Sequence, residues 1–360
     1  MTNQRAIPFL QFRGGSSKGV FFHLDDLPKE KEQRDHVLKW IMGAHGDSRQ
    51  VDGLGGADPL TSKIAIVAPS GRDDSDIDYT FIQAIVGEDR VDDTPNCGNL
   101  LSAVGAFALE TGMITANGVM AEVNIYMTNS GNRCRLVFPI EDGKPSYEGD
   151  ASIDGVLGVS APVMCFYQDL AGSACGALLP TGNLIDTYEG VEVTCVDNGM
   201  PVVMMRAEDF GITGAESPEA LNANEPLKEK IEAIRLQAGR DMGLGDVGPK
   251  AVPKMCLASE ALDGGSFNTR MFIPKMCHKA IGVLGAVSAA TAAGMAGSAV
   301  ASLASVPEGD KKVMTIEHPS GVFDVQLDYK DGEITGAGLL RTTRLLARGD
   351  AFIPRHVWPE

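Results

Sequence analysis

Two stretches of this sequence, CGNLLSAVGAF at 97–107 and CHKAIGVLGAV at 277–287, begin with a cysteine and carry Gly-Ala from the eighth position after it. The two cysteines stand 180 residues apart (277 − 97), which is half of the 360-residue chain. Each stretch is rich in glycine and alanine, a composition typical of a helix buried on all sides. A repeat at this offset predicts a duplicated fold.

The segments before the two cysteines repeat as well. An apolar run ending in acidic residues occurs at 19–27 and again at 202–210. A charged amphipathic helix is expected after each run, over 30–44 and 225–242. Short strand patterns follow at 64–67, 79–86, 255–258 and 269–274. Because this order is not an alternation of strand and helix, we predict an α+β fold of two pseudo-repeated halves.

Each half is expected to form a curved, mostly antiparallel sheet around one central apolar helix, with the active site in the cleft between the halves. The halves are predicted at 1–183 and 184–345, and the tail 346–360 is expected to pack back on the N-terminal half. A long uncharged run at 280–304 has the length of a membrane span. We interpret it as a buried helix because it is rich in small residues.

The composition excludes several classes of function. The net charge is −17, which argues against a general nucleic-acid or membrane-surface role because both partners are polyanions. The seven cysteines are scattered without a CxxC pair, so neither a zinc site nor a disulfide framework is predicted. A reducing cytoplasm is the expected compartment, since the start of the chain has no signal-peptide pattern. No metal and no cofactor are predicted.

Cys97 has the sequence context of a reactive thiol. Pro95, Asn96 and Gly98 are loop and cap residues, and a helix is expected directly after them. A helix N-terminus lowers the pKa of a cysteine and offers free N–H groups to a carboxylate. Cys277 is expected at the same position on its own helix. Two such termini facing one cleft would bind a dianion or trianion.

Two glycine-rich segments add donors and a base. RGGSSKG at 13–19 suits a carboxylate or phosphate, although it has neither the P-loop nor the Rossmann spacing. DGLGGADPLTSK at 52–63 ends with Lys63 entering an apolar strand. Partial desolvation there would lower the pKa of the lysine and make it a usable base. A surface lysine at a strand edge is the alternative interpretation.

The paired cysteine segments resemble the diaminopimelate epimerase fold family, and residues 96–99 resemble its first cysteine motif. Leu100 stands where the amino-acid epimerases have glycine, and CHKA at 277–280 replaces their Cys-Gly-Thr-Gly, so amino-acid epimerisation is not expected. The chain is more similar to the PrpF group within this fold. The motifs that carry the similarity are RGGSSKG (13–19), DGLGGADPLTSK (52–63), DDTPNCGN (92–99), IRLQAGRDMGLGD (234–246), MFIPKMCHKA (271–280), IEHPSG (316–321) and RTTR (341–344).

The resemblance to the PrpF group implies a cofactor-independent isomerase that shifts a proton on a small unsaturated tricarboxylate. The chain is most similar to 4-oxalomesaconate tautomerases, and a 2-methylaconitate or methylitaconate isomerase is the alternative. The resemblance places Lys63 as principal base and Cys97 as proton donor or relay, with the reverse assignment left open. The residues expected to bind the substrate are Arg13, Ser16, Ser17, Ser62, Gly98, Asn99, Arg270, Cys277, His278 and Ser320.

Other hypotheses remain open from the sequence. A non-catalytic binder of small carboxylates would keep the fold, but the presence of both Lys63 and Cys97 argues against it. A cysteine hydrolase would need a histidine and an acidic or amide residue paired with Cys97. A homodimer is the expected assembly.

Overall fold

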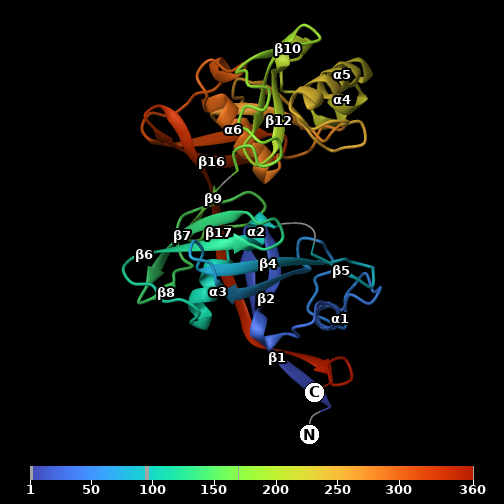
Figure 1. Ribbon diagram of the computed structural model, residues 1–360, viewed down its shortest axis with the longest axis vertical. Coiled ribbons are helices and arrows are strands. Elements are labelled where there is room, and N and C mark those ends of the chain that lie inside the picture. Colours follow the sequence, from blue (N-terminus) through green and yellow to red (C-terminus); the bar gives the residue numbers. More distant parts are fainter. Residues whose placement is uncertain (1–2, 94–96, 169, 360) are drawn as a thin grey trace. The chain divides into compact units, whose positions relative to one another are not determined.

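The computed structural model describes residues 3–93, 97–168 and 170–359, and the chain forms two compact units (Figure 1). Unit 1 consists of Met1–Phe166 with Leu340–Glu360, and unit 2 consists of Tyr167–Leu339. The predicted loop and cap residues Pro95 and Asn96 lie outside the described residues.

Unit 1 is a ring of strands. They are β1 (Gln4–Gly14), β2 (Ser17–His23), β3 (Lys63–Pro69), β4 (Ile77–Ala84), β5 (Val91–Asp92), β6 (Met120–Met127), β7 (Arg133–Glu141), β8 (Lys144–Pro145), β9 (Pro162–Gln168) and the later part of β17 (Glu333–Pro354). Most neighbours pair antiparallel, whereas β2–β3 and β4–β6 pair parallel. β9 pairs with both β7 and β17, and β17 pairs with β1, which closes the ring.

The inner helices of unit 1 are α2 (Gly98–Leu101) and α3 (Val104–Thr111), which correspond to the glycine- and alanine-rich stretch. All side chains from position 104 to 109 are buried. A Cβ atom added at Gly105 would lie 2.5 Å from Cε1 of Phe138, so α3 and β7 pack too closely for any larger residue. The predicted central apolar helix is therefore confirmed.

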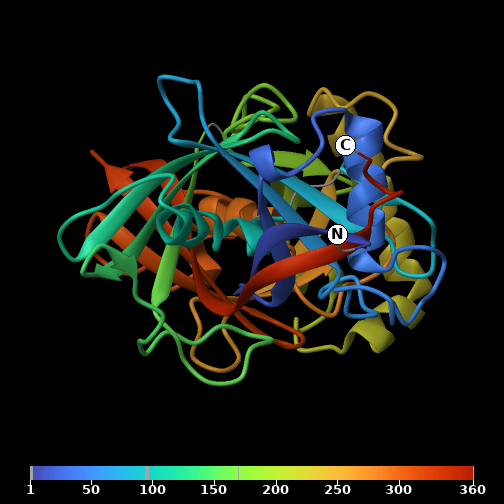
Figure 2. The same cartoon turned by 90° about the horizontal axis from the view of Figure 1, so that it is seen from below.

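A third helix, α1 (Lys31–Met42), covers the other face of these strands. It contributes Val37 and Leu38 to a core that includes Ile64 and Ile66 of β3. The C-terminal turn lies beside α1, where Nε2 of Gln33 donates to the carbonyl of Val357 at 2.5 Å (Figure 2).

Unit 2 repeats this plan. Its strands are β10 (Asp186–Tyr188), β11 (Val191–Asp197), β12 (Pro201–Arg206), β13 (Lys254–Ser259), β14 (Phe267–Phe272), β15 (Lys311–His318), β16 (Gly321–Lys330) and the first part of β17. Its helices are α4 (Pro218–Ala223), α5 (Glu225–Asp241) and the buried α6 (Val283–Gly294). Here β12–β13 and β14–β15 are the parallel pairs.

The two units match in the order of their main elements. An antiparallel pair (β1–β2 or β11–β12) leads into a short 3₁₀ turn, η1 (Leu24–Asp26) or η2 (Ala207–Phe210). A helix then returns the chain to a strand that begins with lysine: Lys63 lies opposite Gly19, and Lys254 lies opposite Val202. The predicted fold, two similar halves of sheet around an apolar helix, is confirmed.

One sequence prediction is wrong: Cys277 does not stand at the start of its helix. The helix α6 begins at Val283, whereas Cys277 forms an isolated β-bridge with Phe272. The intervening residues form a local turn, because Nδ1 of His278 accepts a hydrogen bond from the N–H of Ala280 at 3.0 Å. A side chain that binds nearby backbone in this way competes with helix formation.

The apolar run at 280–304 is divided between α6, which ends at Gly294, and the 3₁₀ helix η3 (Ala301–Leu303). Among the helices of the described residues, none has the length and apolar character needed to cross a membrane.

Candidate active site

Cys97 is the N-cap residue of α2. Its Sγ accepts a hydrogen bond from the backbone N–H of Leu100 at 3.4 Å, and its carbonyl accepts one from Oη of Tyr79 at 3.3 Å. The side chain is 9% exposed, at the boundary of the core. The expected position of this thiol at a helix start is confirmed, although α2 is only one turn long.

Lys63 is the first residue of β3 and is buried. Its Nζ donates to Oε1 of Gln83 at 3.0 Å and lies 5.0 Å from the ring centre of Phe81. No carboxylate of the described residues forms an ion pair with it. The ammonium group therefore has a neutral acceptor in place of a counter-charge.

One face of β4 contacts both the ammonium of Lys63 and the backbone of Cys97. Tyr79, Phe81 and Gln83 alternate along this strand and therefore share a face. Gln83 holds the ammonium of Lys63, and Tyr79 holds the carbonyl of Cys97. The nearby β2 is close to both segments. A Cβ atom at Gly19 would lie 2.7 Å from the carbonyl oxygen of Lys63 and 3.0 Å from Leu100 of α2.

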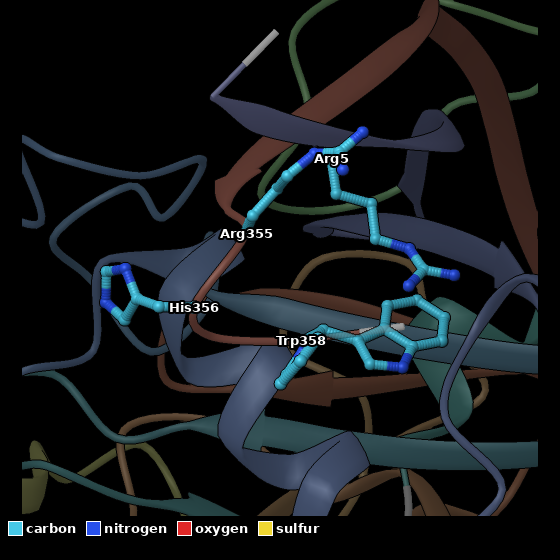
Figure 3. A pocket seen from close by; sticks show the side chains of 5 residues that line it. Arg5, Arg355, His356 and Trp358 are labelled. Carbon is cyan, nitrogen blue, oxygen red and sulfur yellow. The ribbon is translucent and has the colours of Figure 1, made fainter. Parts of the chain in front are cut away.

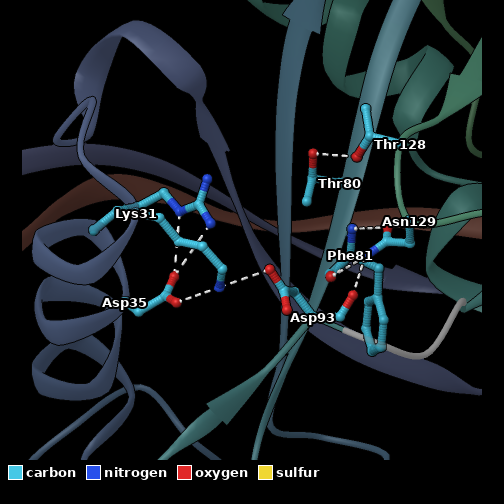
Figure 4. A network of polar contacts seen from close by, with 8 residues as sticks. Lys31, Asp35, Thr80, Phe81, Asp93, Thr128 and Asn129 are labelled. Atoms are coloured by element: carbon cyan, nitrogen blue, oxygen red, sulfur yellow. Dashed lines mark hydrogen bonds and ion pairs between the residues drawn. The ribbon is translucent and has the colours of Figure 1, made fainter.

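A polar network connects β4 to the segment around Asp93 (Figure 4). The side chain of Asn129 accepts from the N–H of Phe81 at 2.8 Å and donates to its carbonyl at 2.9 Å. The same amide donates to the carbonyl of Asp93 at 2.6 Å. Nζ of Lys31 lies 2.7 Å from the carboxylates of both Asp35 and Asp93. Asn129 therefore ties the strand position under Lys63 to the segment that leads to Cys97.

The glycine-rich loop at 13–19 rests on the first turn of α2. A Cβ atom added to Gly14 would lie 2.7 Å from the carbonyl oxygen of Asn99. A Cβ atom added to Gly15 would lie 2.3 Å from Oδ1 of the same residue. Gly15 also has a φ of +52°, which favours glycine. Nδ2 of Asn99 donates to Oγ of Ser16 at 3.1 Å. Ser17 is buried, and its Oγ has no hydrogen-bond partner among the described residues.

Arg13 makes this corner of unit 1 electropositive. Its guanidinium donates to the carbonyl of Gly15, to the carbonyl and Oγ1 of Thr342 and to Oγ of Ser160, at 2.8–3.1 Å. Burial, and then the guanidinium of Arg344, lower the pKa of Arg13. Within the described ranges, no carboxylate pairs with either arginine. Two cations without an acidic partner are suited to an anionic ligand.

Ser62 lies directly before Lys63 and is completely buried. Its Oγ donates to Oε1 of Gln50 at 2.5 Å and accepts from the N–H of Gly56 at 3.2 Å. These contacts order the loop that carries Lys63 into β3.

In unit 2 the structure brings three of the predicted residues together. The N–H of Cys277 donates to Oδ1 of Asn222 at 2.7 Å, and its thiol donates to the carbonyl of His278 at 3.7 Å. Oγ of Ser320 donates to the carbonyl of Lys279 in the same turn. Burial raises the pKa of Cys277 to about 11, and Arg270 opposes this increase.

Arg270 is buried on β14 and is engaged by its own unit. Its Nε donates to the carbonyl of Glu216 at 2.8 Å, and its Nη1 donates to Oδ1 of Asn268 and to the carbonyl of Thr269 at 2.7 and 2.8 Å. These contacts support the edge of unit 2 next to Cys277.

The PrpF protein family model matches residues 4–354 of this chain. The chain belongs to the PrpF family. It is 53% identical to a 4-oxalomesaconate tautomerase of Pseudomonas putida over 99% of this chain and 98% of that protein. It is 49% identical to a (4E)-oxalomesaconate Δ-isomerase of a Novosphingobium species, over 98% of each chain. The crystal structure of a methylitaconate-Δ-isomerase superposes with a TM-score of 0.91 at 34% identity, covering 99% of this chain and 97% of that one.

These relatives are all isomerases, so the predicted class of this PrpF protein, an isomerase, is confirmed. The predicted roles of individual residues stay predictions.

Three residues of this PrpF protein were missed in the sequence: Tyr79, Gln83 and Asn129. The first two have a signal, because YTFIQAIV at 79–86 places Tyr79 and Gln83 four residues apart, on one face of a mostly apolar strand. Asn129 has none, since it follows β6 and reaches β4 only through the fold.

A separate cavity of about 520 Å³ lies on unit 1 and is lined by Arg5, Arg355, His356, Trp358 and Pro359 (Figure 3). The guanidinium of Arg5 lies 3.5 Å from the ring centre of Trp358. Arg5 is near the start of β1 and Arg13 near its end, roughly 26 Å along an extended strand. The described side chains include no group of three or more His, Cys, Asp or Glu residues that could hold a metal ion.

Proposed function

We propose that this PrpF protein is a 4-oxalomesaconate tautomerase, which shifts a proton on an unsaturated tricarboxylate by keto–enol or allylic isomerisation. Such a reaction belongs to the breakdown of gallate or protocatechuate. The sequence identity to the two oxalomesaconate isomerases, which extends over nearly the whole chain, supports this substrate over others.

The observation that carries the proposal is the shared face of β4. Tautomerisation needs one group that removes a proton from carbon and a second group that returns one. The ammonium of Lys63 and the segment of Cys97 are held on that face by Gln83 and Tyr79. Two proton carriers on one face of a strand are the groups that this reaction needs, and general acid–base catalysis contributes about 10²–10⁴-fold in rate.

In the proposed mechanism, the neutral amine of Lys63 takes the proton from the carbon next to the substrate carbonyl. The electron pair moves through the conjugated system, and the thiol of Cys97 gives its proton to the far carbon or to the oxygen. The ammonium of Lys63 and the thiolate of Cys97 then exchange their proton, directly or through water, which restores both groups. The opposite assignment of base and acid uses the same two residues.

Binding of the substrate carboxylates is proposed for the corner next to α2. Arg13 and Arg344 carry positive charge there without an acidic partner among the described side chains. Ser16, Gly98 and Asn99 offer hydroxyl, backbone and amide donors. Ser17, whose buried hydroxyl has no hydrogen-bond partner among the described residues, and Ser62, directly before Lys63, keep their proposed binding role.

The residues of unit 2 keep their proposed binding role. Cys277 and His278 lie in one turn, Ser320 between β15 and β16 donates to Lys279 of that turn, and Arg270 lies on the neighbouring β14. Their contribution is measured by substitution, with KM as the readout.

A methylitaconate or 2-methylaconitate isomerase is the second candidate. The structural similarity to a methylitaconate-Δ-isomerase supports this candidate.

We further propose that the enzyme works without a cofactor, in the cytoplasm and as a homodimer. The seven cysteines are all free, as is usual in a reducing compartment. Sedimentation equilibrium measures the assembly.

The test follows the ultraviolet spectrum of 4-oxalomesaconate, 3-methylitaconate and 2-methylaconitate with the EDTA-treated enzyme. We expect the fastest turnover with 4-oxalomesaconate, and deuterium from the solvent in the product. Lys63→Ala serves as the inactive control. No spectral change with any of the three at high enzyme concentration would contradict the isomerase assignment, and binding without turnover would favour a carboxylate-binding protein.

A further inference from the structure

Gln83 is held in one orientation by its surroundings. Its Nε2 donates to three backbone carbonyls, those of Pro59, Ser62 and Ala84, at 3.1, 2.9 and 3.1 Å. If the amide were reversed, Oε1 would face these three carbonyl oxygens and Nε2 would face the ammonium of Lys63. Both contacts would be repulsive. The oxygen of Gln83 must therefore point at Nζ of Lys63, 3.0 Å away.

The contact also fixes the loop that leads to Lys63. Pro59 and Ser62 belong to the glycine-rich segment before β3, whereas Gln83 lies on β4. A single side chain thus connects three things: the loop, the strand and the amine. The ring of Phe81 beneath the amine limits where Nζ can lie.

The neutral charge of Gln83 matters for a base. A carboxylate at this distance would stabilise the charged form of lysine and raise its pKa by about one to three units. An amide oxygen accepts a hydrogen bond from an ammonium group and from a neutral amine alike. Lys63 can therefore lose and regain a proton while its nitrogen stays in place.

We propose that Gln83 is the positioning residue of the reaction: it aims Lys63 at the substrate and leaves its ammonium without a counter-charge. This inference rests on the proposed function, in which Lys63 is a proton carrier.

The first experiment replaces Gln83 by glutamate in the full-length protein and measures kcat/KM against pH. We expect at least a tenfold loss at pH 7 and a shift of the ascending limb by at least one pH unit upward, because the new carboxylate holds the proton on Lys63. The control is Gln4→Glu, the same chemical change at the exposed start of β1, roughly 30 Å along the strand from Gly14. It should stay within about twofold.

A second variant tests positioning apart from charge. Gln83→Met has a similar length but no hydrogen-bonding groups, so we expect kcat to fall about tenfold while KM changes less than about twofold. A value of kcat within twofold of the original would overturn the inference. This variant also keeps the test open if the glutamate variant does not fold.

A measurement that does not depend on activity separates this inference from the proposed function. Lysine labelled with ¹³C at Cε gives an NMR signal for Lys63, assigned by its absence in Lys63→Arg. Gln83→Glu should raise the titration midpoint of this signal by at least one pH unit. A midpoint unchanged within about 0.3 units would overturn the inference. Full turnover by Lys63→Ala would instead count against the proposed function, and the NMR midpoint is independent of that result.

Discussion

Cys97 in unit 1 and Cys277 in unit 2 begin similar stretches of sequence, but the structure treats them differently. Cys97 is directly followed by helix and caps it with its sulfur, which accepts the N–H of Leu100. Cys277 is separated from α6 by a turn, and its thiol donates to a carbonyl. Burial accordingly raises the pKa of Cys277, so this thiol stays protonated at neutral pH.

The lysines that begin the equivalent strands β3 and β13 also differ in their surroundings. Lys63 is bonded to Gln83 and lies over Phe81. Lys254 begins β13, and burial lowers its pKa. Duplication thus provides the frame twice, whereas the arrangement proposed for proton transfer is found in the described residues of unit 1.

The largest expected difference is between the two lysines. Lys63→Ala should lower kcat/KM for 4-oxalomesaconate by about 10³-fold, because the proposed base is lost. Lys254→Ala is the matched control and should stay within about threefold. Circular dichroism checks that both variants fold. Equal losses in the two variants would show that the halves share the proton work.

The next difference is between the two cysteines. Cys97→Ser keeps a cap for the N–H of Leu100 but replaces the thiol with a far weaker acid, so kcat should fall about 10²-fold. Cys277→Ser should change kcat less than about threefold and act mainly on KM. Steady-state kinetics with both variants measures the split. A larger loss of kcat at Cys277 would reverse the comparison.

The pH dependence of alkylation sharpens the comparison further. Because burial raises the pKa of Cys277 to about 11, only about 10⁻³ of this thiol is ionised at pH 8. Its rate of reaction with iodoacetamide should rise about tenfold per pH unit from 7 to 10, and level off above the pKa. Mass spectrometry of the Cys97→Ser protein follows the peptide that contains Cys277. A rate independent of pH over this range would be inconsistent with the raised pKa.

The smallest expected effect concerns the two inner helices. A methyl group at Gly105 would meet the ring of Phe138 at 2.5 Å, whereas at Gly285 it would meet the flexible side chain of Met271 at 3.0 Å. Gly105→Ala should therefore lower the free energy of unfolding by about 1–3 kcal/mol. Gly285→Ala should change it by less than about 1 kcal/mol, because the gain in helix propensity offsets the crowding. Urea denaturation of both variants compares them, and an equal cost would mean that the two helices are packed alike.

The sequence predicts most of this fold because both halves of the chain carry the same order of sequence patterns. The apolar runs at 19–27 and 202–210 appear as β2 and β12 followed by the turns η1 and η2. The predicted amphipathic helices correspond to α1 and α5 within a few residues. What the repeat does not reveal is where each inner helix begins: a turn in which Ala280 donates to Nδ1 of His278 separates Cys277 from the start of α6.

The site could be predicted only in part. Lys63 and Cys97 lie within recognisable motifs, so the pair is visible in the sequence. Gln83 and Asn129 act through contacts with distant backbone, to Pro59 and to Asp93. Contacts of this kind depend on which strands become neighbours, and a single sequence does not specify that at the level of one side chain.

The strand β17 has a consequence for how the chain folds during synthesis. Its later residues, Leu345–Pro354, pair with Gln4–Phe12 of β1, and positions 4–9 of β1 have that strand as their partner in the described pairings. A ribosome therefore releases the whole of unit 2 before the strand that completes unit 1 exists. Until then β1 is an open sheet edge, which can pair with other chains. The first residues to be made are thus among the last to reach their final pairing.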